Sequence, residues 1–290
     1  MTKALSRYRL FPSPRNLQLP SLTVILPAFN ERLRLPRTLT LLSEWARSQP
    51  FEVEILVVDD GSDDATAAMA ASHQADCRVI RLHRNSGKGA AVRLGMLAAE
   101  GDIVAFTDSD LPYRLESLSE AHAMIAGREA EVVYGARDLP DSKDVSGRNA
   151  SRALASACFR KITSILVPCG VLDTQCGLKV YSANAARAVF SRVHTDGFAF
   201  DAEAILVAHK LGIGTAKVAV TLVNEAGSTV SLRRHAPAML RDLLLARLRH
   251  GWEAGPAGAA VPDFDTLRNL RPDHFLAVAS FTRRRARMSA

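Results

Sequence analysis

The chain has 290 residues, of which 48% are hydrophobic and 23% charged, which is ordinary for a folded soluble protein with a sizeable core. The formal charge of +7 suits anionic partners: nucleotide diphosphates, phospholipid surfaces or nucleic acid. The four cysteines include no CxxC pair, so we expect neither a disulfide framework nor a zinc site, and favour reduced thiols in a cytoplasmic protein.

Membrane-spanning and secretory segments are not expected. The basic first 20 residues lack the apolar core of a secretory signal, and no stretch approaches the roughly 18 apolar residues of a spanning helix. The protein is therefore expected in the cytoplasm, with at most a peripheral contact to a membrane.

The first half of the chain alternates predicted strands with predicted helices. This alternation indicates repeated β–α units, and hence an α/β fold whose mixed, mostly parallel sheet is flanked by helices. In chain order we expect strand 22–26, helix 36–48, strand 53–58, helix 65–73, strand 78–82, helix 87–99, strand 103–106, helix 115–126 and strand 131–135.

The second half gives a helix over 149–167, a loop and short strand over 173–181, a helix over 200–211 and a strand over 215–223. The segment 237–250 is an amphipathic helix candidate whose leucines are flanked by arginines. Such a helix either packs on the core or lies on an anionic membrane, and the sequence leaves both open. We divide the chain into an arm (1–20), a catalytic domain (21–235), the amphipathic helix (236–252) and a flexible basic tail (253–290).

Polar clusters follow several predicted strands, and ligands of such sheets bind at the carboxyl ends of the strands. Asp108 and Asp110 follow the strand 103–106. Residues two apart in extended chain point to the same side, so both carboxylates can converge on Mg²⁺ or Mn²⁺, which would neutralise a diphosphate. This pair predicts a metal site.

Three further segments are candidates. Asp60, in a strand-to-helix turn, could accept hydrogen bonds from a base or ribose; the alternative is that this turn only caps the next helix. Lys88, in the glycine-rich run 85–90, could reach a phosphate or belong to a plain turn. Asp201 opens a helix, where the helix dipole favours its anion, and could orient or deprotonate an acceptor.

A basic series comprises Arg137, Arg148 and Arg152, the last two one helical turn apart. These arginines could hold an anionic acceptor or form a solvated basic face.

Together these segments resemble the GT-A fold glycosyltransferases of family 2. Five motifs occur in the order of that family over roughly residues 21–235: VILPAFNE, VVDDGSDD, RNSGKGAAVRLG, FTDSDLP and FDAE. Within the family, the segment 173–179 (DTQCGLK) and the run Gly135–Arg137 are similar to motifs of dolichyl- and polyprenyl-phosphate hexosyltransferases. In the segment 173–179, four residues are further candidates for the site: Gln175, Cys176, Gly177 and Lys179.

The resemblance implies a nucleotide-sugar donor, a polyprenyl or dolichyl phosphate acceptor, and Mg²⁺ or Mn²⁺. The implied roles are as follows: Pro27, Phe29, Asn30, Glu31 and Asp60 hold the nucleoside; Lys88 and Arg233 (or Arg234) serve the diphosphate; Asp108 and Asp110 hold the metal; Asp201 is the acceptor-side carboxylate; Arg137, Arg148 and Arg152 bind the lipid phosphate. The implied reaction is an inverting transfer of a hexose, glucose before mannose, from a UDP- or GDP-sugar.

Three alternatives remain. The same fold could serve a soluble saccharide or phosphorylated acceptor, or it could be a nucleotidyltransferase that releases pyrophosphate. The third is a non-catalytic basic module that binds nucleic acid or membranes. An aromatic content of 6% without a stacking cluster gives nucleic-acid binding no support, so no nucleic-acid partner is expected.

Overall fold

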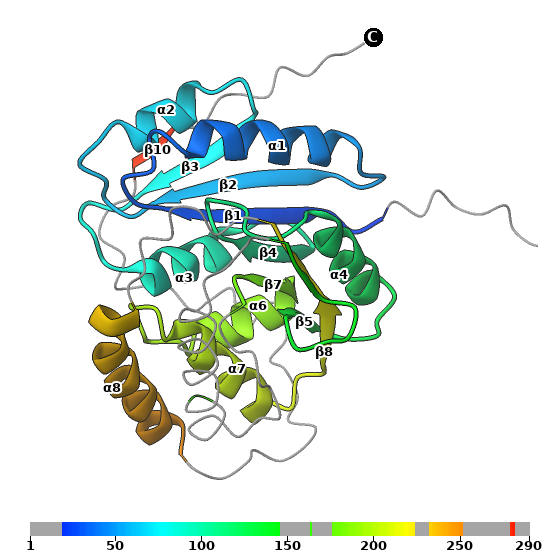
Figure 1. Cartoon of the computed structure of the whole chain (residues 1–290), viewed down its shortest axis with the longest axis vertical. Helices are drawn as coiled ribbons and strands as arrows, with labels where there is room; N and C mark the ends of the chain where they lie inside the picture. The colour runs from blue at the N-terminus through cyan, green and yellow to red at the C-terminus, as the bar shows by residue number, and fades with distance from the viewer. Residues whose placement is uncertain (1–18, 146–162, 164–175, 224–231, 252–278, 282–290) are drawn as a thin grey trace, which may run out of the picture.

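The computed structural model describes residues 19–145, 163, 176–223, 232–251 and 279–281 (Figure 1). Several expectations lie outside these residues: Arg148, Arg152 and Gln175, nearly all of the arm and the tail, and all but one residue of the predicted helix 149–167.

An eight-stranded sheet runs through the molecule in the order β10-β3-β2-β1-β4-β7-β5-β8. Strands β1, β2, β3 and β4 are parallel, as are β5 and β8, whereas β7 and β10 are antiparallel to their neighbours. The predicted mixed, mostly parallel sheet is thus confirmed. The bounds are β1 Leu22–Ala28, β2 Val53–Asp59, β3 Cys77–Arg81, β4 Ile103–Thr107, β5 Val132–Ala136, β7 Leu178–Ser182, β8 Thr215–Ala219 and β10 Ala279–Phe281, with β6 Lys143–Asp144 and β9 Thr221–Leu222 as a separate pair.

Helices cover both faces of the sheet because successive strand residues point to opposite faces. In β1, Val24 and Leu26 enter one hydrophobic cluster and Ile25 enters the other. The first cluster is covered by α1 (Leu35–Arg47), α2 (Thr66–Ser72) and α4 (Glu116–Ala126), and the second by α3 (Lys88–Ala98), α6 (Ala183–Phe190) and α7 (Phe200–Lys210).

Most predicted elements that fall on described residues are confirmed within a few residues, but α6 was not predicted. Its eight residues are too few for a clear helical period in the sequence. The one local signal is Ser182, whose hydroxyl accepts a hydrogen bond from the Ala185 amide at 3.2 Å and caps the helix.

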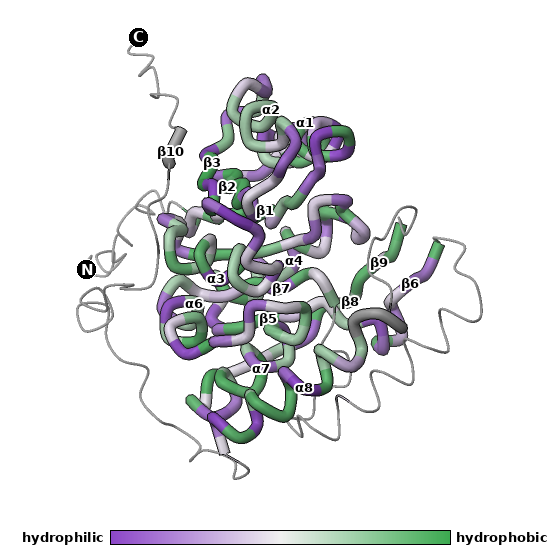
Figure 2. Tube along the Cα trace, turned by 90° about the vertical axis from the view of Figure 1, so that its left-hand side faces the viewer, coloured by the Kyte–Doolittle hydropathy of each residue, from purple (hydrophilic) through white to green (hydrophobic). Residues whose placement is uncertain are grey.

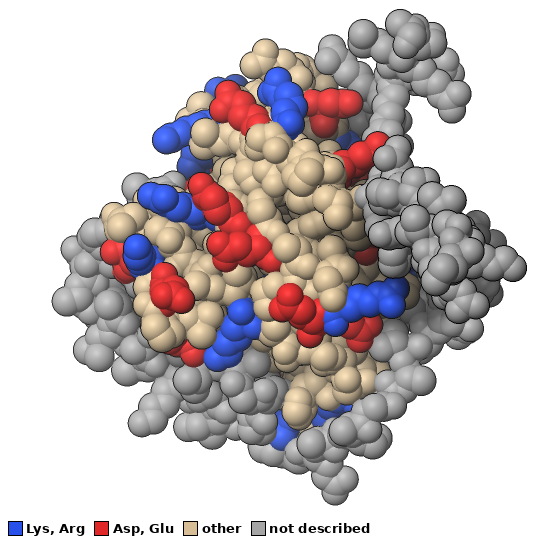
Figure 3. Space-filling model, turned by 90° about the vertical axis from the view of Figure 1, so that its right-hand side faces the viewer, with Lys and Arg blue, Asp and Glu red and all other residues tan. Residues whose placement is uncertain are grey.

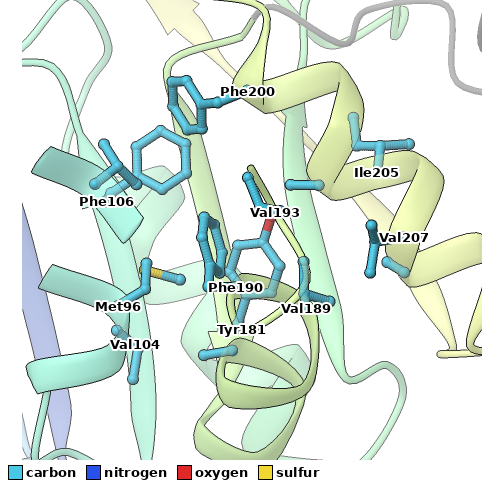
Figure 4. Packing of buried hydrophobic residues seen from close by; sticks show 14 of the residues in the cluster. Met96, Val104, Phe106, Tyr181, Val189, Phe190, Val193, Phe200, Ile205 and Val207 are labelled. Atoms are coloured by element: carbon cyan, nitrogen blue, oxygen red, sulfur yellow. The ribbon is translucent and has the colours of Figure 1, made fainter. Parts of the chain in front are cut away.

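Aromatic packing joins the sheet to α7 beneath the carboxyl edge. The rings of Phe106 in β4 and Phe200 in α7 lie 5.5 Å apart, and Figure 4 shows them facing each other above the side chains of Met96 and Phe190. Because Phe200 directly precedes Asp201, this contact fixes the start of α7 relative to the end of β4.

The helix α8 (Leu232–His250) lies beside α7, as Figures 1 and 2 both show. Its buried side includes Met239 and Leu243, whereas Leu244 and Leu248 are 47% and 69% exposed. The structure therefore has a helix where one was predicted, with part of its apolar side chains packed on the core, and its contact with a membrane stays a prediction. His250 at its end contacts the buried Glu203 carboxylate at 2.9 Å.

Acidic and basic side chains are interspersed over the side of the molecule that lies to the right in Figure 1 (Figure 3). Among the described residues, no helix is both long enough and apolar enough to traverse a bilayer.

Candidate active site

The carboxyl ends of the parallel strands β1, β2 and β4 meet at one edge of the sheet. Ala28 and Asp59, the last residues of β1 and β2, are direct partners in the register. The predicted site residues that follow these strands therefore start from adjacent positions.

The turn after β1 is tied to the turn after β2. Asn30 adopts a left-handed backbone with φ of 55°, which asparagine tolerates better than most residues. Its amide donates to the Ser62 hydroxyl at 2.9 Å, and its side-chain oxygen accepts from the Asp63 amide at 3.0 Å. Ser62 thus braces Asn30, and the helix α2 that follows this turn has no side-chain hydrogen bond at its N-cap residue, Ala65.

Asp60 holds the glycine-rich segment. Its two carboxylate oxygens accept hydrogen bonds from the Ser86 and Gly87 amides, both at 2.8 Å. Burial raises the pKa of Asp60, against the lowering effect of these two bonds. A role in binding the nucleoside would use the remaining lone pairs of this carboxylate.

The backbone of the glycine-rich segment is also held from the other side. The Gly89 amide donates to the Asp196 carbonyl at 2.7 Å, and a Cβ at Gly89 would lie 2.3 Å from the Thr195 carbonyl oxygen. The amides of Ser86, Gly87 and Gly89 are therefore engaged within the protein. From this segment, the side chain of Lys88 could bind a phosphate.

Lys88 lies at the centre of the charged residues. Its ammonium group forms an ion pair with Asp108 Oδ1, with side-chain exposures of 22% and 30%. Burial alone would lower the pKa of Lys88, but the carboxylates of Asp108, Asp201 and Asp110 raise it. Three acidic residues, two from the turn after β4 and one from the start of α7, thus act on one lysine.

The expected extended conformation of Asp108 and Asp110 is wrong. Both residues follow the last residue of β4, and the Leu111 amide closes a turn by donating to the Asp108 carbonyl at 3.0 Å. Burial and the neighbouring Asp108 charge raise the pKa of Asp110 to about 6, so the charges of the two carboxylates act on each other. The turn, and not strand alternation, brings the two together.

Asp201 forms a buried ion pair with Lys179. The Lys179 ammonium, on β7, donates to Asp201 Oδ1 at 2.7 Å and to the Cys176 carbonyl at 2.8 Å. The two side chains are 0% and 5% exposed. Burial raises the pKa of Asp201, while the positive charges of Lys179 and Lys88 oppose that rise. The sequence does not reveal that Lys179 and Asp201 are partners, because 22 residues separate them.

The segment Cys176–Lys179 contacts both Asp108 and Asp201. A Cβ at Gly177 would lie 2.2 Å from Asp108 Oδ2, so no side chain fits there without moving that carboxylate. A Cβ at Gly135 would lie 2.7 Å from the sulfur of the fully buried Cys176. Close contacts therefore explain why glycine, and no larger residue, fits at positions 135 and 177.

The remaining candidates differ in accessibility. Pro27 is buried within β1, so its side chain is badly placed for the direct nucleoside contact that we expected, whereas Phe29 is 40% exposed. The Glu31 carboxylate is paired with Arg34 at 2.7 Å. Arg137 directly follows β5, which is parallel to β4. Arg233 lies on α8, but its side chain is not among those that the structure describes.

The donor set suits a hard divalent cation. Carboxylate oxygens are preferred ligands of Mg²⁺ and Mn²⁺, and the closely spaced Asp108 and Asp110 repel each other without a cation. Over the described ranges, no group of three or more His, Cys, Asp or Glu side chains could hold a metal. The two aspartates therefore suit an ion that keeps water or phosphate oxygens as its other ligands.

Comparison with known proteins gives a consistent result. The sequence model of "Glycosyl transferase family 2" matches residues 23–190. The dolichyl-phosphate beta-glucosyltransferase of Dictyostelium discoideum is 32% identical over 243 residues, covering 79% of this chain and 74% of that protein. The enzymes of the same name from Drosophila melanogaster and Homo sapiens are 32% and 30% identical, covering 83% and 79% of this chain and 78% and 75% of their own lengths.

Solved structures share the fold at lower identity. Mannosyl-3-phosphoglycerate synthase from Rubrobacter xylanophilus has a TM-score of 0.59 at 20% identity, covering 79% of this chain and 73% of its own. Glucosyl-3-phosphoglycerate synthase from Mycobacterium tuberculosis, in complex with Mn²⁺, UDP and glucosyl-3-phosphoglycerate, has a TM-score of 0.59 at 21% identity, covering 84% and 82%.

Proposed function

Because this chain belongs to glycosyl transferase family 2 and has the GT-A fold, we propose that it transfers glucose from a nucleotide-diphosphate sugar to dolichyl phosphate or another polyprenyl phosphate. The chain is a glycosyltransferase. The substrate proposal is supported by relatives at 30–32% identity that carry the name dolichyl-phosphate beta-glucosyltransferase. UDP and GDP are the candidate nucleotides, and mannose is the next candidate sugar.

The observation that carries the proposal is the convergence of Asp108, Asp110 and Asp201 around Lys88 at the carboxyl edge. In the proposed reaction an oxygen of the acceptor phosphate forms a bond to C1 of the sugar. The bond from C1 to the donor diphosphate breaks, and its electron pair leaves with the nucleoside diphosphate. Attack from the opposite face inverts the configuration at C1.

Asp108 and Asp110 are proposed to hold Mg²⁺ or Mn²⁺, which when bound stabilises the negative charge of the leaving diphosphate. Asp60 and the exposed ring of Phe29 lie at the neighbouring strand ends and would contact the nucleoside. The Lys88 ammonium would contact the diphosphate, since it is the cationic side chain of the glycine-rich segment and is partly exposed.

Asp201 is proposed to orient the acceptor. A phosphate acceptor is already an anion near neutral pH, so it needs little deprotonation. A hydroxyl acceptor would need Asp201 as a base, which contributes about 10²–10⁴-fold in rate. Asp201→Asn also weakens the buried pair with Lys179, so its kcat is compared in protein that circular dichroism shows to be folded. In that protein a small loss of kcat favours a phosphate, and a loss of that size favours a hydroxyl.

The lipid end of the acceptor is proposed to meet the protein near α8. Leu244, Leu245 and Leu248 are exposed on this helix, with Arg241 beside them at 71% side-chain exposure. Apolar and basic side chains on one helix suit a peripheral contact with an anionic membrane. Arg137, with Arg148 and Arg152, would bind the acceptor phosphate.

The test is transfer of labelled sugar from UDP- and GDP-sugars into an organic-extractable polyprenyl phosphate, with Mg²⁺, Mn²⁺ or EDTA. The proposal expects metal-dependent label in the organic phase. Asp108→Ala should abolish it, while Asp76→Ala, at an exposed aspartate away from the site, should not. Release of nucleoside diphosphate with label only in the aqueous phase would replace the lipid with a soluble acceptor. Release of pyrophosphate would indicate a nucleotidyltransferase.

A further inference from the structure

Lys88 combines a rigid backbone with a long, mobile side chain. Its neighbours Gly87 and Gly89 are held by Asp60 on one side and by the Asp196 carbonyl on the other. Gly87 adopts a φ of 103°, a conformation that glycine alone adopts readily. The α-carbon of Lys88 is therefore fixed at the first residue of α3, while its side chain has four rotatable bonds.

The ammonium group lies at the position where a cation would bind Asp108. Lys88 pairs with Oδ1 of that carboxylate, and Gly177 lies against Oδ2, where a Cβ on this residue would come within 2.2 Å. We expect a metal ion that binds Oδ1 to compete with Lys88, because two cations held by one carboxylate oxygen repel each other. Asp110 and Asp201 lie close enough to Lys88 for their charges to act on it, so the ammonium stabilises all three acidic groups.

We propose that the Lys88 ammonium occupies the cation position of Asp108 in the donor-free enzyme, and that Lys88 transfers to the donor diphosphate when Asp108 takes a divalent cation. This proposal rests on the proposed metal site. One cation replaces another at Asp108, so this carboxylate is never left without a positive partner.

Because the Lys88–Asp108 pair is partly exposed, such an exchange costs little free energy. Water can solvate the separated charges of a partly exposed ion pair, so breaking such a pair costs less than breaking a buried one. At 22% and 30% side-chain exposure, Lys88 and Asp108 are open to water, unlike the Lys179–Asp201 pair. Only Lys88 is therefore free to release its carboxylate during a reaction cycle.

The proposal predicts opposite effects of one substitution on metal binding and on turnover. Lys88→Met removes the competing cation, so the donor-free protein should bind Mn²⁺ about tenfold more tightly, while kcat falls because the diphosphate loses its partner. Lys88→Arg, which keeps the charge, should leave the Mn²⁺ Kd close to that of the wild type. A residue that served only the fold would not strengthen one function and weaken the other.

The experiment measures free Mn²⁺ by electron paramagnetic resonance in titrations of the donor-free full-length protein. The matched control is Lys217→Met, since Lys217 pairs with Asp138 at 3.1 Å with similar exposures of 29% and 28%. The expected result is a lower Kd for Lys88→Met alone. A crystal structure with Mn²⁺ should then show the metal on Asp108 and Lys88 displaced from it.

A Kd for Lys88→Met that equals or exceeds the wild-type value overturns the exchange. So does a Mn²⁺ complex in which Lys88 still contacts Asp108, and so does a failure of both proteins to bind Mn²⁺ without donor. The proposed metal-dependent transfer fails separately, if wild-type transfer is unchanged in EDTA. The two failures are therefore distinguishable.

Discussion

Two lysine–aspartate pairs lie in the same site and differ in their access to water. Lys88 and Asp108 are 22% and 30% exposed, whereas Lys179 and Asp201 are 0% and 5% exposed. The first pair connects the start of α3 with the turn after β4, and the second connects β7 with the start of α7. Similar charges at similar separations therefore serve different purposes.

Burial decides what each pair can do. Separating an exposed pair leaves two solvated ions, whereas separating a buried pair leaves an uncompensated charge in an apolar environment. The Lys179–Asp201 pair is therefore suited to fixing geometry, and the Lys88–Asp108 pair to exchanging partners. Lys179→Met and Lys88→Met, the largest and the smallest expected effects on stability, test this difference directly, and changes at Glu203 and Gly177 test the surroundings of the two pairs.

Lys179→Met should destabilise the protein strongly. It leaves the buried Asp201 without its ammonium partner, which typically costs about 3–5 kcal/mol. Urea denaturation followed by circular dichroism measures the change. The double variant Lys179→Met/Asp201→Leu removes both charges and should recover most of the stability. A double variant as unstable as the single one would show that the loss comes from packing and not from the unpaired charge.

Acid should weaken the attachment of α8 to α7 through Glu203. Burial alone would raise the pKa of Glu203, but hydrogen bonds from His250, Thr195 and His194 lower it from 4.5 to about 2. A folded-state pKa below the unfolded value gives stability that is complete above pH 4.5 and is lost as the pH falls toward 2. The full contribution is about 3 kcal/mol.

Denaturation midpoints between pH 2 and 6, for the wild type and Glu203→Gln, check this prediction. The wild type should lose stability below pH 4.5 by more than the variant does, because glutamine does not titrate. Parallel curves for the two proteins would contradict the assignment of the acid loss to Glu203.

Gly177→Ala should impair the site more than the fold. The new methyl group would meet Asp108 Oδ2, the mobile end of a side chain, so the free energy of unfolding should change by less than about 1 kcal/mol. Displacing Asp108 by about 1 Å should lower kcat/KM by up to roughly 10²-fold. Gly214→Ala, where a Cβ meets nothing within 4 Å, is the matched control and should change neither quantity.

Lys88→Met should have the smallest effect on stability. Loss of a partly exposed pair changes the free energy of unfolding by about 0–1 kcal/mol. The same urea experiment as for Lys179→Met makes the comparison direct. A loss as large as that of Lys179→Met would remove the distinction between the exchangeable and the fixed pair.

Much of the fold could be predicted because its signals are local. The run Leu22–Leu26 and the segment Val53–Val58 are apolar enough to indicate buried strands, and the helices between them carry an apolar face. The position of Asp108 and Asp110 after a strand also followed from order along the chain. The prediction was wrong about their conformation, since strand alternation ends at Thr107 and a turn decides where the carboxylates point.

The sequence by itself indicated the family and the alternation of strands and helices, and it supplied the acidic and basic residues that we propose for the site. Only the tertiary structure decided how those residues are paired: Asp60 with the Gly87 amide, Lys88 with Asp108, and Lys179 with Asp201. Partners that lie 20 to 27 residues apart leave no periodic trace in the sequence. Their contacts and exposures arise when β4, β7, α3 and α7 pack together, and exposure then separates the exchangeable pair from the fixed one.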